Sequence, residues 1–131
     1  MSRQASLCRQ RIVDTVAVLG RLAQAANGSG PLIRGSFYTY RRRCGKKGCR
    51  CARGELHLSR AFGVSADGRS RVVSLRGMDR EEVEVGVKAW RQWRQTRAAM
   101  GVAFAELLRA VDRLGKANTR PVDRLRRAAP G

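Results

Sequence analysis

The sequence predicts a mainly α-helical fold, in which a long antiparallel α-hairpin of the coiled-coil type carries an inserted zinc knuckle and β-hairpin. Two long segments repeat apolar residues at helical spacing. Between them lie three of the four cysteines and the only histidine, followed by β-favouring runs around an Asp-Gly turn. The 131 residues suffice for one small domain, which we place at residues 1–115.

The first helix is expected at residues 3–26. Its apolar residues recur at spacings of 3 or 4 along one stripe, on which Cys8 also falls as a small apolar residue; they are Ile12, Val16, Leu19, Ala23 and Ala26. The sequence NGSGP at 27–31 then ends the helix, because glycine, asparagine and proline all disfavour its continuation.

Residues 35–77 are expected to form the zinc knuckle and the β-structure. GSFYTYRRR at 35–43 is rich in β-favouring residues and leads into the cysteines. HLSRAFGVSADGRSRVVSLRG at 57–77 predicts a β-hairpin whose turn is Ala66-Asp67-Gly68, since Asp-Gly suits a tight turn between strands.

The second helix is expected at residues 79–114, with Asp79 as its N-cap and Gly115 as its C-cap. Its stripe alternates spacings of 3 and 4, which predicts a coiled-coil seam interrupted by one charge; the positions are Val83, Gly86, Trp90, Trp93, Arg97, Met100, Phe104, Leu107, Val111 and Leu114. This helix is longer than the first, so part of it needs another partner. We expect a homodimer or a coiled-coil partner protein.

The net charge of +18 is concentrated in two places. Residues 31–60 carry nine cations against one acid, and residues 116–131, which we expect to be a disordered basic tail, carry five against one. Residues 78–115 are nearly balanced, with seven cations and six acids. Arginine greatly outnumbers lysine, so coding bias is an alternative explanation for part of the charge, although a uniform bias would not produce this contrast.

The sequence also limits the compartment. It contains no run of about 18 apolar residues, so we expect no membrane span. The first residues carry scattered charges and no small-residue cleavage site, so we expect no signal peptide. A cytoplasmic, reducing location follows, in which clustered cysteines hold metal more often than they form disulfides.

The cysteines predict a structural zinc site. The pattern C-x4-C-x-C-x5-H supplies three thiolates and one imidazole, a common tetrahedral set, from Cys44, Cys49, Cys51 and His57. Glycines 45, 48 and 54 would let the loop fold back on one ion, and an extended chain would place both sulfurs of Cys49 and Cys51 on one side. The alternatives are free thiols beside a solvated histidine, a disulfide, or an iron–sulfur cluster completed by Cys8.

No catalytic arrangement is evident, so we expect no enzyme. Glu55 is the only carboxylate near the cluster, and a chain with one histidine committed to metal cannot build a nucleophile–base pair around it. Seven cations among 13 residues instead suggest phosphate binding; they are Arg41, Arg42, Arg43, Lys46, Lys47, Arg50 and Arg53. Tyr38 and Tyr40 share one face of a strand and could stack on bases, or could simply cover a small core.

The stretch CGKKGCRCARGELH resembles the signature of a family of small uncharacterised bacterial proteins, C-G-K-x-x-C-x-C-x-x-G-x-x-H followed by a β segment and a long helix. The resemblance covers roughly residues 34–115 and implies the same four metal ligands, with Gly45 and Lys46 as loop positions. Members typically continue with Gly-Pro-Tyr, whereas this chain continues with Leu58-Ser59-Arg60. The resemblance implies no established activity; it suggests a link with mobile genetic elements.

These observations predict a zinc-stabilised, strongly basic, non-enzymatic accessory protein that binds DNA or RNA through its phosphates. The alternative is a protein–protein adaptor, a small subunit of a larger assembly that works through its coiled coil and meets an acidic partner with its basic loop.

Overall fold

The structure, a computed structural model, describes residues 2–127. The chain divides into two compact units, Met1–Gly28 with Trp93–Gly131 and Ser29–Gln92. We call the first the helix-pair unit and the second the sheet unit. The long second helix passes through both. Within residues 2–127, no helix combines the length and the apolar character that a membrane crossing requires.

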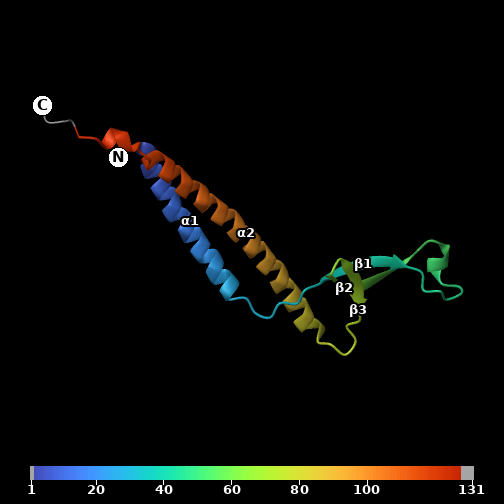
Figure 1. The fold of residues 1–131 in the computed structure, drawn as a ribbon. Helices are drawn as coiled ribbons and strands as arrows, with labels where there is room; N and C mark the ends of the chain where they lie inside the picture. The colour runs from blue at the N-terminus through green and yellow to red at the C-terminus, as the bar shows by residue number, and fades with distance from the viewer. Residues whose placement is uncertain (1, 128–131) are drawn as a thin grey trace. The chain divides into compact units, whose positions relative to one another are not determined.

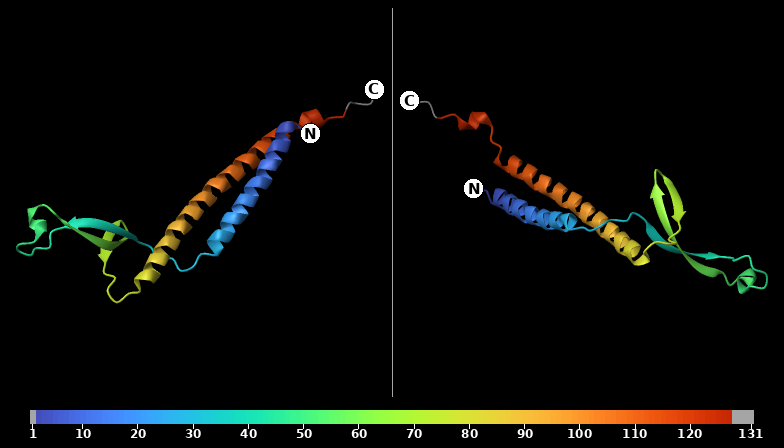
Figure 2. Two further views of the ribbon diagram at one scale, coloured as in Figure 1. Left: turned by 180° about the vertical axis from the view of Figure 1, so that it is seen from behind. Right: turned by 90° about the horizontal axis from the view of Figure 1, so that it is seen from below.

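The helix-pair unit consists of two antiparallel helices that lie side by side (Figures 1 and 2). Helix α1 is Arg3–Asn27, and its N-cap is Ser2, whose hydroxyl accepts the N–H of Ala5 at 3.0 Å. Helix α2 is Arg80–Asn118 and pairs with α1 through its part beyond Trp93. This confirms the predicted α-hairpin with an insertion between its helices.

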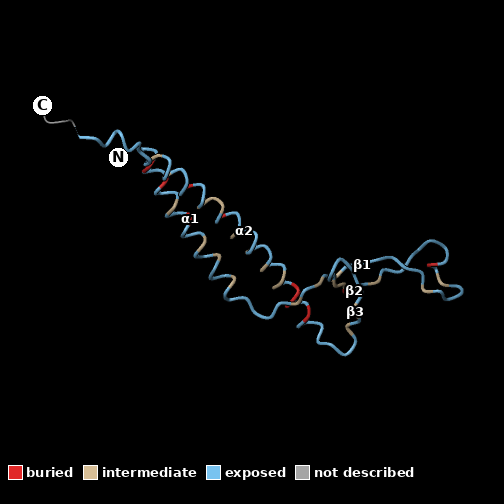
Figure 3. The backbone as a smooth tube through the Cα atoms, in the orientation of Figure 1, coloured by how far each residue is buried: buried red, intermediate tan, exposed pale blue. Residues whose placement is uncertain are grey.

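Small side chains are the most deeply buried residues between the two helices. The buried residues are Ala5, Cys8 and Thr15 on α1 and Ala103 and Ala110 on α2 (Figure 3). Larger side chains lie around them and are half-buried, among them Ile12 and Leu19 on α1 and Met100 and Leu107 on α2. Thr15 is tolerated there because its hydroxyl donates to the Arg11 carbonyl oxygen at 2.7 Å.

The predicted seam was therefore wrong in detail. Val16, Phe104 and Val111 are exposed, and so is Arg97. The observed stripe on α2 after Trp93 comprises Thr96, Met100, Ala103, Leu107, Ala110, Leu114 and Ala117, all buried or half-buried. Met100, Leu107 and Leu114 belong to both stripes, whereas Thr96, Ala103 and Ala110 take the places that hydropathy assigned to Arg97, Phe104 and Val111. The heptad phase shifts near Trp93, at the boundary between the two units.

The sheet unit contains three antiparallel strands in the order β1-β2-β3. They are β1 (Ser36–Arg42), β2 (His57–Ala66) and β3 (Arg69–Val73). The predicted hairpin between β2 and β3 is confirmed, and its turn residues Asp67 and Gly68 have φ values of 53° and 74°. Both values lie in the left-handed region that Asp-Gly favours in two-residue hairpin turns.

One face of the sheet forms a small core with the first turns of α2. Phe62, Val83 and Val87 are buried there, and Phe37 packs against Phe62 with 5.1 Å between the ring centroids. The helix begins where it was predicted to, because Asp79 Oδ1 accepts the N–H of Glu82 at 3.2 Å as an N-cap. This core holds the sheet by only one face.

The end of α2 differs from the prediction. The helix passes Gly115 and ends at Asn118, because Gly115 keeps a helical backbone and good helix formers follow it. A 3-10 helix, η2 (Val122–Leu125), lies in the segment for which no structure was expected. The disorder of the tail in solution stays a prediction, and residues 128–131 lie outside the described part of the chain.

Candidate metal centre

Strand pairing brings the two ends of the cysteine motif together. Arg42, the last residue of β1, is paired with His57, the first residue of β2. Cys44 follows β1 by two residues, so it lies beside His57 although 13 positions separate them in the sequence. The loop that joins the strands carries Cys49 and Cys51 back to the same place.

The loop folds as the glycines predict. Gly45, Gly48 and Gly54 have φ values of 78°, 82° and 107°, a backbone region that other residues adopt only with strain. Between the last two lies a 3-10 helix, η1 (Arg50–Arg53), with Cys49 at its N-cap position. Cys49 has an extended backbone, but Cys51 lies inside the 3-10 turn, so the expected extended segment at Cys49–Cys51 was wrong; the chain turns after Cys49, and strand alternation does not place the two sulfurs.

The four ligand atoms are close enough to share one ion. The three sulfurs and a ring nitrogen of His57 all lie within 4.8 Å of one another. Cys44 Sγ lies 3.5 Å from Cys51 Sγ, and Cys49 Sγ lies 3.1 Å from His57 Nε2. In a tetrahedral zinc site the corresponding separations are about 3.8 Å and about 3.6 Å, from the usual bond lengths. The donor set and its spacing therefore fit a metal ion.

Burial and hydrogen bonding differ among the thiols. The Cys51 residue is buried, with 1% of its surface exposed, whereas Cys44 and Cys49 are half-buried and His57 is exposed. The pKa of the Cys51 thiol is lowered, chiefly because the backbone N–H of Cys44 donates to its sulfur at 3.3 Å. The backbone of Cys51 acts to lower the pKa of the Cys49 thiol, but the neighbouring Cys44 and Cys51 thiols and desolvation outweigh it, so that pKa is raised. A metal ion would displace the proton that Cys49 otherwise keeps.

This geometry argues against two of the alternatives, a disulfide and an iron–sulfur cluster completed by Cys8. The 3.5 Å between Cys44 and Cys51 is far longer than a disulfide bond. Cys8 is buried in α1, as the sequence predicted for an apolar residue, and is not one of the clustered ligands. The structure thus presents a cluster of three cysteines and one histidine whose ligand atoms could hold one metal ion, and the choice of metal belongs to the proposal below.

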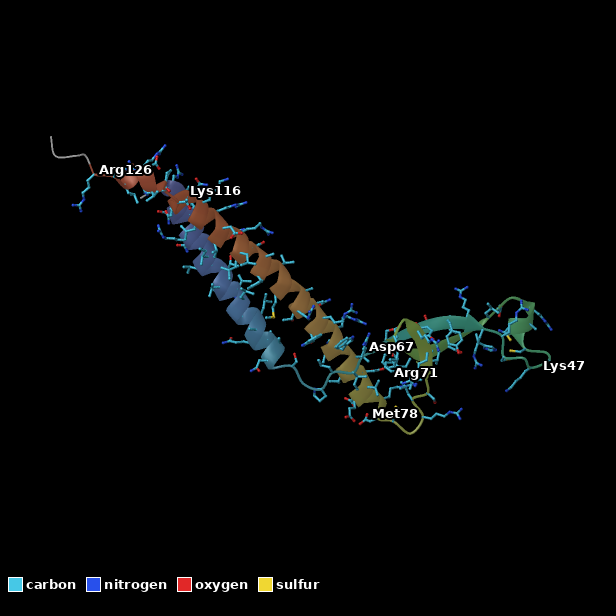
Figure 4. The ribbon with its side chains drawn as sticks, viewed as in Figure 1. Lys47, Asp67, Arg71, Met78, Lys116 and Arg126 are labelled. Atoms are coloured by element: carbon cyan, nitrogen blue, oxygen red, sulfur yellow. The ribbon has the colours of Figure 1, made fainter. Side chains whose placement is uncertain are left out.

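The basic residues predicted to bind phosphate all lie in and beside this loop, and all are exposed. Figure 4 places Lys47 on its outer bend. The three arginines at 41–43 do not share one surface. Arg41 is paired with Leu58 on the face that carries Phe37, whereas Arg42 lies on the opposite face and donates to the Ser59 hydroxyl at 2.7 Å.

Tyr38 and Tyr40 lie on the same sheet face as Arg42. Their rings are 6.2 Å apart, and each side chain is about two-fifths exposed, at 41% and 43%. The opposite strand contributes only small residues to this face beside them, Ser59, Ala61 and Gly63. A Cβ on Gly63 would lie 3.0 Å from the Tyr38 ring, so the glycine leaves room for it. We call Tyr38, Tyr40 and Arg42 the tyrosine face. The tyrosines therefore do not cover a core.

Sequence reasoning missed a second basic feature. An open groove of about 380 Å³ is lined by Tyr40 and by three arginines, Arg60, Arg76 and Arg80, among others. Arg60 is held in place by Glu84 at 3.6 Å and by the Phe37 ring at 4.8 Å. These arginines are scattered in the sequence, and only the hairpin brings them together, so no local pattern could have revealed them.

Comparison with protein-family models, with curated proteins and with solved structures yields no match. The family resemblance drawn from the cysteine motif therefore stays a prediction. Its structural content, a cluster of three cysteines and one histidine followed by a long helix, is present in the chain.

Proposed function

We propose that this chain is a zinc-stabilised protein that binds single-stranded nucleic acid with its tyrosine face and its basic metal loop. Zinc is the metal we assign, because three thiolates and one imidazole are a structural zinc set and softer or harder cations favour other donors. Four protein ligands would fill a tetrahedral site and leave no open position for a substrate, so we assign no reaction to it.

The observation that carries the proposal is the composition of one exposed sheet face. Two aromatic rings and an arginine lie in a row on that face, and the row leads directly to His57 of the metal loop. Aromatic rings stack on unpaired bases of any sequence, while arginine and lysine neutralise phosphates. The opposite sheet face packs on α2, which leaves the tyrosine face as the open one.

Charge supports the same assignment. The loop cations Lys46, Lys47, Arg50 and Arg53 make no ion pair with an acidic side chain among the described residues. A solvated loop in a stable protein has no need of so many unneutralised charges, whereas a polyanion would neutralise them all. Phosphate contacts of this kind give affinity without sequence preference.

The test is fluorescence anisotropy with labelled single-stranded and duplex DNA and RNA of mixed sequence. We expect affinity to fall roughly 10³–10⁵-fold between about 50 and 200 mM salt if six to ten phosphates are contacted. Tyr40→Ala should weaken single-strand binding by about 5- to 150-fold, which corresponds to about 1–3 kcal/mol per stacked base, and should affect duplex binding less.

Arg41 and Arg42 provide a matched pair of variants. Both are exposed arginines at the end of β1, but only Arg42 lies on the tyrosine face. Arg42→Ala should therefore weaken binding more than Arg41→Ala does. Equal effects, or a Tyr40→Ala protein that binds single strands as well as the parent, would contradict the proposed surface. If partners captured by the protein survive nuclease and moderate salt, the adaptor function takes its place.

A further inference from the structure

An apolar strip lies exposed along α2 in the helix-pair unit. Phe104 is 54% exposed, Leu108 is 48% exposed and Val111 is 45% exposed. Their spacing of 4 and 3 places them on one side of the helix, next to the contact with α1 but outside it. We call these three residues the open strip. A chain otherwise rich in charge keeps three large apolar side chains in water here.

The open strip and Val16 of α1 project from the same side of the helix pair. On the other side, Arg11 of α1 and Glu106 of α2 approach to 3.9 Å. At about 100° per residue, Val16 is turned roughly 140° from Arg11, and Phe104 roughly 160° from Glu106. Val16 is 52% exposed, so the strip is part of an apolar face that both helices share.

The residues around the strip are complementary to themselves when two α2 helices run antiparallel. Suppose that the two-fold axis passes between Phe104 and Ala105. A residue of one α2 helix then lies opposite the residue of the second copy for which the two residue numbers add up to about 209. Arg97 then faces Asp112 of a second copy, and Gly101 faces Leu108 of that copy. The positive arginine lies opposite a negative aspartate, and the glycine lies opposite a large leucine. The two-fold axis produces each of these contacts twice.

Two features of α2 that the single chain does not explain agree with this pairing. Neither Arg97 nor Asp112 has an ion-pair partner within residues 2–127. Gly101 stands in the middle of a helix, where glycine costs about 1 kcal/mol relative to alanine, and a Cβ there would meet no neighbouring atom of the described chain within 4 Å. A large side chain from another helix would use the space.

We propose that a second copy of this chain covers the open strip, with the two α2 helices antiparallel about a two-fold axis near Phe104. Residues 94–115 span about 32 Å, and two helices side by side are about 20 Å wide. The resulting face covers roughly 640 Å² in projection. Its accessible area is larger than its projection and therefore approaches the roughly 800 Å² that each partner buries in a stable interface. The inference does not depend on the proposed function, since none of these residues belongs to the sheet unit.

The experiment is sedimentation equilibrium of the full-length zinc-loaded protein from about 0.5 to 50 μM. We expect a monomer–dimer equilibrium in the parent. Leu108→Asp should raise the dissociation constant by about 100-fold or more, because each dimer would bury two carboxylates. Val102→Asp is the matched control: Val102 is 62% exposed on α2, but it points away from the strip, so this variant should dimerise as the parent does. Circular dichroism should show unchanged helix content in both variants.

Charge reversal tests the antiparallel register itself. Arg97→Asp and Asp112→Arg should each weaken the dimer about tenfold or more, because each sets like charges opposite each other twice, and the double reversal should restore it. A parent that is monomeric at 50 μM overturns the proposal, as does equal disruption by Val102→Asp and Leu108→Asp. If the two single reversals weaken the dimer and the double reversal does not restore it, the proposed register is wrong. Dimerisation that fails while single-strand binding persists leaves the proposed function untouched.

Discussion

The contact between Ile33 and Gly86 predicts how the sheet unit is fixed to α2. Gly86 is buried in the helix, and its carbonyl oxygen accepts the N–H of Ile33 at 3.0 Å. A Cβ at position 86 would lie 2.5 Å from two side-chain carbons of Ile33 and 2.9 Å from its Cβ. The hydrogen bond prevents the Ile33 backbone from moving away, so the clash cannot relax cheaply.

Two opposing terms set the effect of Gly86→Ala. Alanine stabilises the helix by about 1 kcal/mol relative to glycine, whereas overpacking costs about 1–3 kcal/mol. We therefore expect a net loss of up to about 2 kcal/mol in the free energy of unfolding. In an Ile33→Gly background, which removes the side chain together with its Cβ, the clash is gone, and the same substitution should stabilise by about 1 kcal/mol.

Urea unfolding of the four proteins in this cycle measures the coupling. It should be about 1–3 kcal/mol, with Gly86→Ala changing sign between the two backgrounds. Gly20→Ala in α1 is the control, because a Cβ there meets nothing within 4 Å and should simply stabilise the helix. An identical effect of Gly86→Ala in both backgrounds would refute the packing argument.

Two further predictions concern the metal and the start of α2. Freshly purified, reduced protein should contain one zinc per chain by elemental analysis, and Cys51→Ser should release it and raise amide exchange between residues 43 and 57; substoichiometric zinc in the parent would contradict this. Structural zinc contributes on the order of 10 kcal/mol to small sites, so the loss should be plainly visible. Asp79→Ala should lower the free energy of unfolding by about 1 kcal/mol, and Asp79→Asn, which still accepts the Glu82 N–H, should restore most of it in thermal melts.

Local chemistry explains which parts of the fold could be predicted from the sequence. The Asp79 cap, the Asp67-Gly68 turn and the glycines of the metal loop each act within a few residues, so their patterns determine their structure. The four residues of the cysteine–histidine cluster were found for the same reason, since their type and spacing are read directly from the chain. Periodicity likewise revealed both helices.

Tertiary packing explains what could not be predicted. Hydropathy assigned Phe104 to the seam, whereas the packing of the two helices buries Ala103, one position earlier, and leaves Phe104 exposed. The groove formed by Arg60, Arg76 and Arg80 depends on the register of the strands. The separation of Arg41 from Arg42 onto opposite faces, in contrast, follows from strand alternation and could have been derived from the predicted strand alone.

The register also links the metal loop to the tyrosine face under the proposed function. His57, a proposed ligand, is also the first residue of β2 and is paired with Arg42. The Arg42 side chain in turn donates a hydrogen bond to Ser59, which is paired with Tyr40. A metal that holds His57 and Cys44 together would close the open end of the β1–β2 ladder, which otherwise ends at an exposed pair without further strand contacts. Fixing this end lowers the number of conformations that the tyrosine face can adopt, so less entropy is lost when bases stack on it. The metal would therefore strengthen binding without contacting the nucleic acid, because it orders the surface that does.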